Sequence, residues 1–439
     1  MSNPNSRSGC VRFFGPLRSL NVEDRRVLLD RSASADSEVR ATTAEILADV
    51  RARGDMALRD LASRFDGVAL DDLEVPRRRW KAALDAMDPP VRRAMERSAN
   101  NITAVHRAFV PLAVEVSPEP GIVVGRRPDP LARVGVYAPG GRAAYPSSVL
   151  MGVVPAKVAG VGEVVVASPP TPDGLPAAVV LAAAELAGAT RVFALGGAGA
   201  IGAFAYGTRS VPRVDRIVGP GNAYVAEAKL QVSGVVGIDS PAGPSELLVI
   251  ADSVASVDVV ARELVAQAEH DPRACVVALV QGETFAIRLR EAIDRLLPSR
   301  ERRTIIQQAL AEQGAVLWVD ALGDAMQWAN DYAPEHLLLC VTDSESALAS
   351  VRNAGTVFLG ETSSVSFGDY MTGANHVLPT GGLARTYSGL STLDFVRWIM
   401  YQRVNTSAAA SLALDVERFA RAEGLDGHAA AAHAWLEEK

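Results

Sequence analysis

Short β-rich runs that end in glycine or other small residues and lead into helical segments are the feature that most constrains the fold of this chain. From Arg133 onward, RVGVY is followed by APGG and a helical run, and GEVVVAS, RVFALGG and RIVGPG each lead into another apolar helical stretch. A second block of this kind begins at Glu246, where helical stretches separate ELLVIA, CVVALV and AVLWVD. Strands that alternate with helices form parallel sheets covered on both faces. The sequence therefore predicts an α/β fold.

Composition excludes several classes of protein. The 439 residues carry a net charge of −7, which argues against nucleic acid as the main partner. Charged residues interrupt every apolar run before the ~18 residues of a membrane span, and the N-terminus lacks the apolar core of a signal peptide. The cysteines are far apart, and no CxxC pair occurs, so we expect reduced thiols in a cytoplasmic protein, two of them inside apolar strands. They are Cys10, Cys275 and Cys340.

Three glycine-rich turns follow strands and open helices. They are Pro139-Gly140-Gly141, Gly196-Gly197-Ala198-Gly199 and Gly219-Pro220-Gly221-Asn222. Backbone amides at a helix N-terminus can hold a phosphate group. None of the turns matches GxGxxG with an acidic ribose contact downstream, so each alone is more typical of a tight turn in an α/β sheet than of a ligand site. At one edge of one sheet, the three together favour a nucleotide crevice.

Four of the six histidines lie in short polar segments together with carboxylates or an amide. Gln267 and His270 are three residues apart, so they share one face near the end of a helix. Glu335-His336 sets an acid beside a base at the start of a strand. The other two segments hold Asp369 with His376 and Glu423 with His428. Such side chains suit zinc, although each segment alone is also typical of a polar surface. The two remaining histidines, His106 and His433, are predicted to be solvated on helices.

Long motifs in these regions resemble the histidinol dehydrogenase family. They are VYAPGG, IVGPGNAYVAEAK, GIDSPAGPSELLVIAD, LVAQAEHDP, YAPEHL, GDYMTGANHVLPTGG, SGLSTLDF and AEGLDGH, in the order and with the spacing of that family. The resemblance extends from about residue 25 to the C-terminus. It implies a zinc-dependent, NAD-linked, four-electron oxidation of L-histidinol to L-histidine, the last steps of histidine biosynthesis. It also implies a homodimer with one zinc per subunit.

The resemblance assigns roles to individual residues. Glu335 and His336 correspond to the catalytic acid–base pair. The zinc ligands correspond to Gln267, His270, Asp369 and His428. Substrate contacts correspond to Ser245, His336, His376 and Glu423 in addition to those ligands, and NAD contacts correspond to Tyr137, Gly199 and Asn222. His428 belongs to a C-terminal segment that, in this family, reaches into the site of the partner subunit.

We therefore expect two Rossmann-like domains with similar parallel sheets and a helical C-terminal segment that crosses to the partner. Residues 137–245 are expected to bind the cofactor, and residues 26–136 together with 246–390 are expected to carry the zinc and the catalytic pair. Residues 1–25 are predicted to be a loose arm, and residues 391–439 a helical dimerisation segment.

The chain departs from the family pattern at a few positions. Gly199 stands where the family has a glutamine that contacts NAD, and smaller differences occur at Ser240 and at Ser363-Ser364. The glycine leaves open a paralogue that oxidises another small alcohol, such as a sulfonated propanediol. A zinc-dependent hydrolase and a non-catalytic zinc-binding homologue are further alternatives. The intact Glu335 and His336 argue against the last of these.

Overall fold

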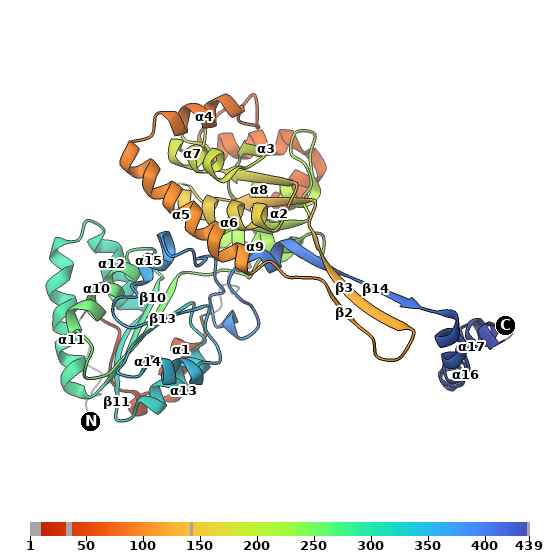
Figure 1. Cartoon of the computed structure of the whole chain (residues 1–439). Helices are drawn as coiled ribbons and strands as arrows, with labels where there is room; N and C mark the ends of the chain where they lie inside the picture. The colour runs from red at the N-terminus through yellow and green to blue at the C-terminus, as the bar shows by residue number, and fades with distance from the viewer. Residues whose placement is uncertain (1–9, 32–36, 141–143, 437–439) are drawn as a thin grey trace.

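Two parallel β-sheets organise the computed structural model, which describes residues 10–31, 37–140 and 144–436 (Figure 1). The five-stranded sheet has the order β6-β5-β4-β7-β8, and the six-stranded sheet has the order β1-β11-β10-β9-β12-β13. The first contains β4 (Arg133–Tyr137), β5 (Glu163–Ser168), β6 (Arg191–Ala194), β7 (Arg216–Val218) and β8 (Gly237–Ile238). The second contains β1 (Phe13–Pro16), β9 (Glu246–Ala251), β10 (Cys275–Gln281), β11 (Gly314–Val319), β12 (His336–Cys340) and β13 (Thr356–Leu359). The predicted α/β fold with parallel sheets is confirmed.

Apart from β1, the two sheets share one topology. In each, the first strand lies in the middle, the next two strands lie on one side of it, and the last two lie on the other side. The direction of the connections reverses between β4 and β7 in one sheet and between β9 and β12 in the other. Such reversal points are where open α/β sheets usually leave a crevice for a ligand.

Two layers of helices cover each face of the five-stranded sheet. The inner helices are α6 (Pro146–Val158), α7 (Ala178–Ala187), α8 (Gly197–Tyr206) and α9 (Ala223–Val232). The outer helices are α2 (Ser37–Arg53), α3 (Asp55–Leu61), α4 (Arg77–Asp85) and α5 (Pro89–Ala108). Helices α6 and α8 each bury eight or more consecutive residues, so they need neighbours on both sides. The outer helices supply those neighbours: α5 and α4 pack on α6 and α7, and α2 and α3 pack on α8.

This packing differs from the expected division of the chain. Residues 26–136 were expected to belong with 246–390, but α2 to α5 share one continuous hydrophobic core with the five-stranded sheet. Leu58 and Trp80, for example, belong to the same cluster as Val134 and Phe204. The periodicity of an amphipathic helix indicates which of its faces is buried, but it does not indicate which sheet that face packs against. The sequence pattern of α2 to α5 therefore could not show that they pack with the five-stranded sheet.

Helices also cover both faces of the six-stranded sheet. On one face lie α10 (Val257–Ala268), α11 (Glu283–Leu296) and α12 (Arg303–Gln313). On the other face lie α1 (Val22–Leu29), α13 (Leu322–Tyr332) and α14 (Ser344–Ser350). Strand β1 pairs with β11, so Phe13–Pro16 are an edge strand and not part of the loose arm that was predicted. Cys275 and Cys340 are buried in β10 and β12, as their apolar surroundings predicted.

A three-stranded antiparallel ribbon extends away from both sheets and carries two helices at its tip (Figure 1). It consists of β2 (Val114–Val116), β3 (Ile122–Pro130) and β14 (Val396–Val404), and its helices are α16 (Thr406–Ala422) and α17 (Asp426–His433). From here on, the arm means residues 396–436, which are distinct from the loose N-terminal arm that the sequence predicted. The prediction that the chain is helical from residue 391 is wrong for β14, whose ladder with β3 fixes an extended backbone. Within the described ranges, no helix is both long and apolar enough to span a membrane.

Candidate active site

Glu335 and His336 lie at the amino edge of the six-stranded sheet, where β12 begins beside β9. Both are buried, with 5% and 3% exposure. The Nδ1 atom of His336 lies 2.9 Å from the backbone oxygen of Glu246. Because a carbonyl only accepts hydrogen bonds, Nδ1 must carry the proton in the neutral ring. Nε2 then keeps its lone pair; it is buried, 3.7 Å from Asp369 Oδ1, and no group in the described part of the chain forms a hydrogen bond with it.

The carboxylate of Glu335 contacts the backbone of Glu246 and the ring of His336. Its Oε2 atom accepts a hydrogen bond from the Glu246 amide at 2.7 Å and lies 3.4 Å from His336 Nδ1. Burial lowers the pKa of His336, but the charges of Glu335 and Asp369 and the Glu335 hydrogen bond outweigh it and raise that pKa to about 9. The pair is therefore electrostatically coupled, as general acid–base chemistry requires.

The loop after α15 (Val365–Tyr370) joins this cluster to the other sheet. Helix α15 presents Asp369 to His336, while His376 Nδ1 lies 3.0 Å from the backbone oxygen of Asp369. His376 Nε2 lies 3.3 Å from Ser148 Oγ, in the first turn of α6, and Asn375 donates to the carbonyl of Met151 in the same helix. The amino edge of the six-stranded sheet therefore lies beside the first turns of α6, which follows β4 of the five-stranded sheet.

Gln267, His270 and Asp369 have donor atoms that suit zinc. Gln267 is 3% exposed near the end of α10, and among the residues that the structure describes its side-chain nitrogen has no hydrogen-bond partner. Turning the amide over would put the oxygen, a possible zinc ligand, in the place of that nitrogen. Burial, together with the nearby charges of Glu335 and Glu263, raises the pKa of Asp369 to about 6, and the charge of His336 only partly offsets this rise. No three His, Cys, Asp or Glu side chains among the residues described here gather closely enough to hold a metal. The set therefore fits a metal only if Gln267 and a further ligand take part.

The arm carries the two remaining predicted residues. Glu423 and His428 are exposed at the end of α16 and in α17, and Figure 1 shows these helices apart from both sheets. A single chain thus does not bring them to the cluster. Ser245 does lie there: it directly precedes β9, and its carbonyl accepts a hydrogen bond from the amide of Cys275 at the start of β10.

The three glycine-rich turns meet at the carboxyl edge of the five-stranded sheet. Gly140 and Gly196 face Pro169 from two sides, with ideal Cβ positions 3.3 and 3.1 Å from its ring. The hydroxyl of Tyr137, the last residue of β4, accepts a hydrogen bond from the amide of Gly197 at 3.1 Å. Gly219 has φ +113°, and a Cβ there would lie 2.1 Å from the carbonyl oxygen of Tyr137, so only glycine fits. These turns lie at the reversal point of the sheet, and we call them the glycine cradle.

Asn222 and Gly199 have local roles in this region. The Asn222 side chain accepts a hydrogen bond from the Val225 amide and so caps α9. Gly199 is buried in α8, where an ideal Cβ would lie 2.8 Å from Leu61 Cδ1 and 3.6 Å from Leu58 Cδ2 of α3. Its missing side chain therefore faces a helix–helix contact, and any cofactor contact at this position falls to its backbone.

Sequence reasoning missed Glu246, Arg31 and Ser148, which hold the cluster in place. The signal for Glu246 was a single acid at the head of an otherwise apolar strand, ELLVIA. The prediction that His106 is solvated is wrong, because it is 2% exposed and continues the buried stripe Met95, Ala99 and Ile102 of α5. The arm residue His433 pairs with Glu417 at 2.8 Å.

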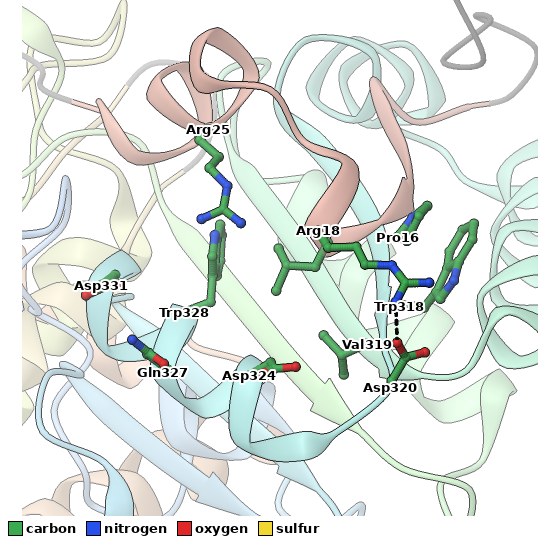
Figure 2. A pocket seen from close by; sticks show the side chains of 11 residues that line it. Pro16, Arg18, Arg25, Trp318, Val319, Asp320, Asp324, Gln327, Trp328 and Asp331 are labelled. Atoms are coloured by element: carbon green, nitrogen blue, oxygen red, sulfur yellow. Dashed lines mark hydrogen bonds and ion pairs between the residues drawn. The ribbon is translucent and has the colours of Figure 1, made fainter.

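A pocket of about 330 Å³ lies away from these residues, between β1, α1, the end of β11 and α13 (Figure 2). Arg18 and Asp320 form an exposed ion pair at its rim, 2.8 Å apart, and Trp328 and Asp331 line it from α13. It contains none of the predicted site residues. The chemistry therefore rests on the amino-edge cluster and not on this pocket.

Comparison with known proteins places these features in a family. The family model for histidinol dehydrogenase matches residues 29–436. The chain is 49% identical over 418 residues to histidinol dehydrogenase of Halobacterium salinarum, covering 95% of this chain and 97% of that protein. It is 43% identical over 420 residues to that of Methanosarcina barkeri, covering 95% and 96%. The crystal structure of histidinol dehydrogenase from Elizabethkingia anophelis superposes with a TM-score of 0.93 at 32% identity, covering 98% of this chain and 99% of that one. The chain therefore belongs to the histidinol dehydrogenase family.

Proposed function

We propose that this enzyme oxidises L-histidinol to L-histidine through bound histidinal, with NAD as the electron acceptor and zinc in the site. The observation that carries the proposal is the cluster of Glu335, His336 and Asp369 at the amino edge of the six-stranded sheet. His376 links this cluster to the start of α6, at the carboxyl edge of the five-stranded sheet. An oxidation at carbon needs a base and a hydride acceptor at adjacent positions. These two edges provide the two positions.

The glycine cradle is the proposed NAD site. The first turns of α6, α8 and α9 open at this edge, so their amides can face a pyrophosphate. Tyr137 fixes the turn before α8, and Asn222 begins α9. When bound, NAD supplies the acceptor for the hydride that leaves the substrate carbon.

Gln267, His270 and Asp369 would hold zinc, with His428 of the partner subunit as the fourth ligand. When bound, zinc supplies a Lewis acid that can grip the imidazole nitrogen and the amine of histidinol. Ser245, His376 and Glu423 complete the proposed substrate contacts. Of these, Ser245 and His376 lie at the cluster, and Glu423 lies on the arm.

The acid–base steps follow from the geometry of the pair. His336 accepts the hydroxyl proton at Nε2 as the substrate carbon loses its hydride, which gives the aldehyde. Glu335 has Oε2 tied to the Glu246 amide, so we assign Oε1 to take a proton from the water that adds to the aldehyde. The oxygen anion left by this addition takes the proton that His336 had gained, which gives the neutral diol and frees Nε2. The diol loses a second hydride from carbon and a proton from oxygen to His336, which gives the carboxylic acid. The acid then ionises to the carboxylate, and Glu335 and His336 release their protons to solvent. Two hydrides and one water per alcohol balance the reaction.

We also propose a homodimer in which the arm crosses to the partner. The arm exposes large apolar side chains that a monomer would leave in water. They include Met400, Val416, Phe419, Leu425 and Trp435. Crossing would cover this surface and bring the partner's Glu423 and His428 toward the cluster, which lacks a ligand within one chain.

A substrate panel tests the function. Purified enzyme with zinc and NAD is given histidinol, histidinal, a sulfonated propanediol and other small alcohols, while NADH absorbance and the carboxylate product are followed. We expect two NADH per histidinol and the highest kcat/KM for histidinol. A higher kcat/KM for a sulfonated alcohol would overturn the proposed substrate, and product formation without NADH would indicate a hydrolase.

A further inference from the structure

Glu246, the first residue of β9, is a buried carboxylate with four hydrogen-bond donors around it. Its Oε1 atom accepts from Arg31 Nε at 2.8 Å and from the Gly381 amide at 2.7 Å. Its Oε2 atom accepts from Arg31 Nη2 at 3.2 Å and from the Glu335 amide at 3.3 Å. Both oxygens are therefore engaged, and Glu246 has no free acceptor for a substrate or a metal.

The same residue holds both members of the catalytic pair. The amide of Glu246 donates to Glu335 Oε2, and its carbonyl accepts from His336 Nδ1. Glu246 and Glu335 thus exchange hydrogen bonds between carboxylate and backbone in both directions. The carbonyl contact also selects the His336 tautomer that leaves Nε2 as a base.

Arg31 links Glu246 to the turn that carries the pair. Its side chain is 4% exposed, and it donates to the carbonyls of Tyr332 at 2.7 Å and Leu28 at 3.2 Å. Its guanidinium lies 3.3 Å from the centre of the Tyr332 ring. These carbonyls belong to the last turns of α13 and α1, where orphan acceptors attract cations.

The turn from α13 into β12 is strained. Ala333, directly before Pro334 and Glu335, has φ +50°, an uncommon backbone conformation for a residue with a side chain. Such a conformation persists only when its surroundings hold it. Arg31 binds the carbonyl on one side of this turn, and Glu246 binds the Glu335 amide on the other side.

We propose that Arg31 and Glu246 are positioning residues that fix the carboxylate of Glu335 and the ring of His336 for catalysis. The inference rests on the proposed roles of Glu335 and His336. Arg31 also neutralises Glu246, which would otherwise be a second buried anion directly beside Glu335. Neither positioning residue touches the reacting atoms in this assignment.

The test uses the full-length enzyme with Arg31→Lys, Arg31→Met, Glu246→Gln and the double variant Arg31→Met/Glu246→Met. Arg18→Met, which removes an exposed ion pair on the same sheet, is the matched control. Thermal midpoints are measured with kcat and KM for NAD, histidinol and histidinal. We expect kcat to fall about 10- to 100-fold for Glu246→Gln with an unchanged KM for NAD. Arg31→Lys should recover part of this loss, because it keeps the charge without the bidentate contact.

The double variant separates positioning from stability. Removing both charges relieves the unpaired buried ion, so the thermal midpoint should recover relative to either single variant. We expect kcat to remain at least tenfold low, because the Glu335 amide and the strained turn have lost their partners. If kcat recovers together with the midpoint, the pair is only structural and the proposal is overturned.

Glu335→Gln and His336→Asn, measured alongside, identify which proposal has failed. If they lose activity while the folded double variant does not, only the positioning role falls. If they keep wild-type activity as well, the proposed function of the pair falls too. If the other single variants do not fold, Arg31→Lys, which keeps the buried charge, is the test: a reduced kcat in the folded protein supports the positioning role, and a wild-type kcat overturns it.

Discussion

The two sheets of this molecule share a strand order, yet they direct opposite edges toward the proposed chemistry. The five-stranded sheet presents its carboxyl edge, with the glycine cradle after β4, β6 and β7. The six-stranded sheet presents its amino edge, with Glu246 and His336 at the starts of β9 and β12. A shared topology therefore does not fix where a site forms.

Helix direction explains the difference in physical terms. At a carboxyl edge the following helices begin, so their positive ends favour anions such as a pyrophosphate. At an amino edge the preceding helices end, so their negative ends favour cations. Helices α10 and α13 end beside the cluster, where the proposed zinc ligands and Arg31 lie. The carboxyl edge of the five-stranded sheet therefore suits an anion, and the amino edge of the six-stranded sheet suits a metal ion and the positive charge that His336 gains when it accepts a proton.

The largest effect is expected from variants that remove a ligand of the proposed zinc at the amino edge of the six-stranded sheet. His270→Ala and His428→Ala should each lose zinc and reduce activity by more than about 100-fold, since loss of a metal ligand exceeds the 10- to 100-fold cost of a supporting contact. Metal content by mass spectrometry and kcat check this. His433→Ala, on the same helix as His428, is the control and should keep both. Zinc at wild-type levels in both ligand variants would remove the metal from this edge.

Mixing two inactive variants tests whether the arm completes the partner's site. Glu335→Gln disables the body and His428→Ala disables the arm, so a mixed dimer with crossed arms contains one intact site. Unfolding and refolding an equal mixture should restore roughly a quarter of the wild-type rate of histidine formation, because half of the dimers are mixed and half of their sites are intact. If each arm served its own chain, every site would stay defective and no histidine formation would return.

A smaller effect is expected at the cofactor edge. Gly199→Gln forces a side chain against Leu61 and should destabilise the protein by about 1–3 kcal/mol. Leu61→Ala in the same chain should relieve the clash and leave room for the amide to turn toward the cradle. We expect only the double variant to bind NAD more tightly, by roughly five- to thirtyfold for one or two hydrogen bonds.

Gly323→Gln is the control for that series, since nothing lies within 4 Å of an ideal Cβ at this helical position. Urea unfolding and NAD titration measure the two effects. Tighter NAD binding by Gly199→Gln alone would show that Leu61 moves aside at little cost, and that α3 and α8 pack less tightly than the structure indicates.

The smallest expected effect concerns pH and the outer layer of the five-stranded sheet. Burial lowers the pKa of His106 to about 4, so the unfolded chain takes up a proton first as the pH falls. Its contribution to stability is complete above its ordinary pKa near ~6.5 and is lost as the pH falls toward 4. Between pH 7 and pH 5 the loss should be roughly 1–2 kcal/mol. His106→Leu should remove this loss in urea unfolding, whereas Met95→Leu, in the same stripe, should keep it.

The strands and inner helices were well predicted from the sequence, because short apolar runs such as RVGVY and ELLVIA alternate with longer helical stretches. The residues of the candidate site were also predicted from the sequence, since Glu335-His336 and the segment around Asp369 carry polar side chains that are uncommon in a hydrophobic core. The place of α2 to α5 was readable in principle: α6 and α8 are apolar around their whole circumference and so required an outer layer.

Other features depended on contacts between distant residues. Arg31 meets Glu246 across 215 positions, and no local pattern records that pairing. Strand β14 has no buried residue and no clean alternation, and its partner β3 has only one buried residue. Its extended form follows from that ladder and not from its own period.

The most direct test of the account is the number of NADH molecules formed per histidinol by wild type and by Glu335→Gln. The variant keeps the shape of the side chain but cannot take a proton from water, and general-base losses are typically ~10²–10⁴-fold. On the timescale of one turnover, wild type should form two NADH and histidine, and Glu335→Gln should form one NADH and an aldehyde trapped by a hydrazine. Two NADH from the variant at the wild-type rate would contradict catalysis by Glu335 at the amino edge.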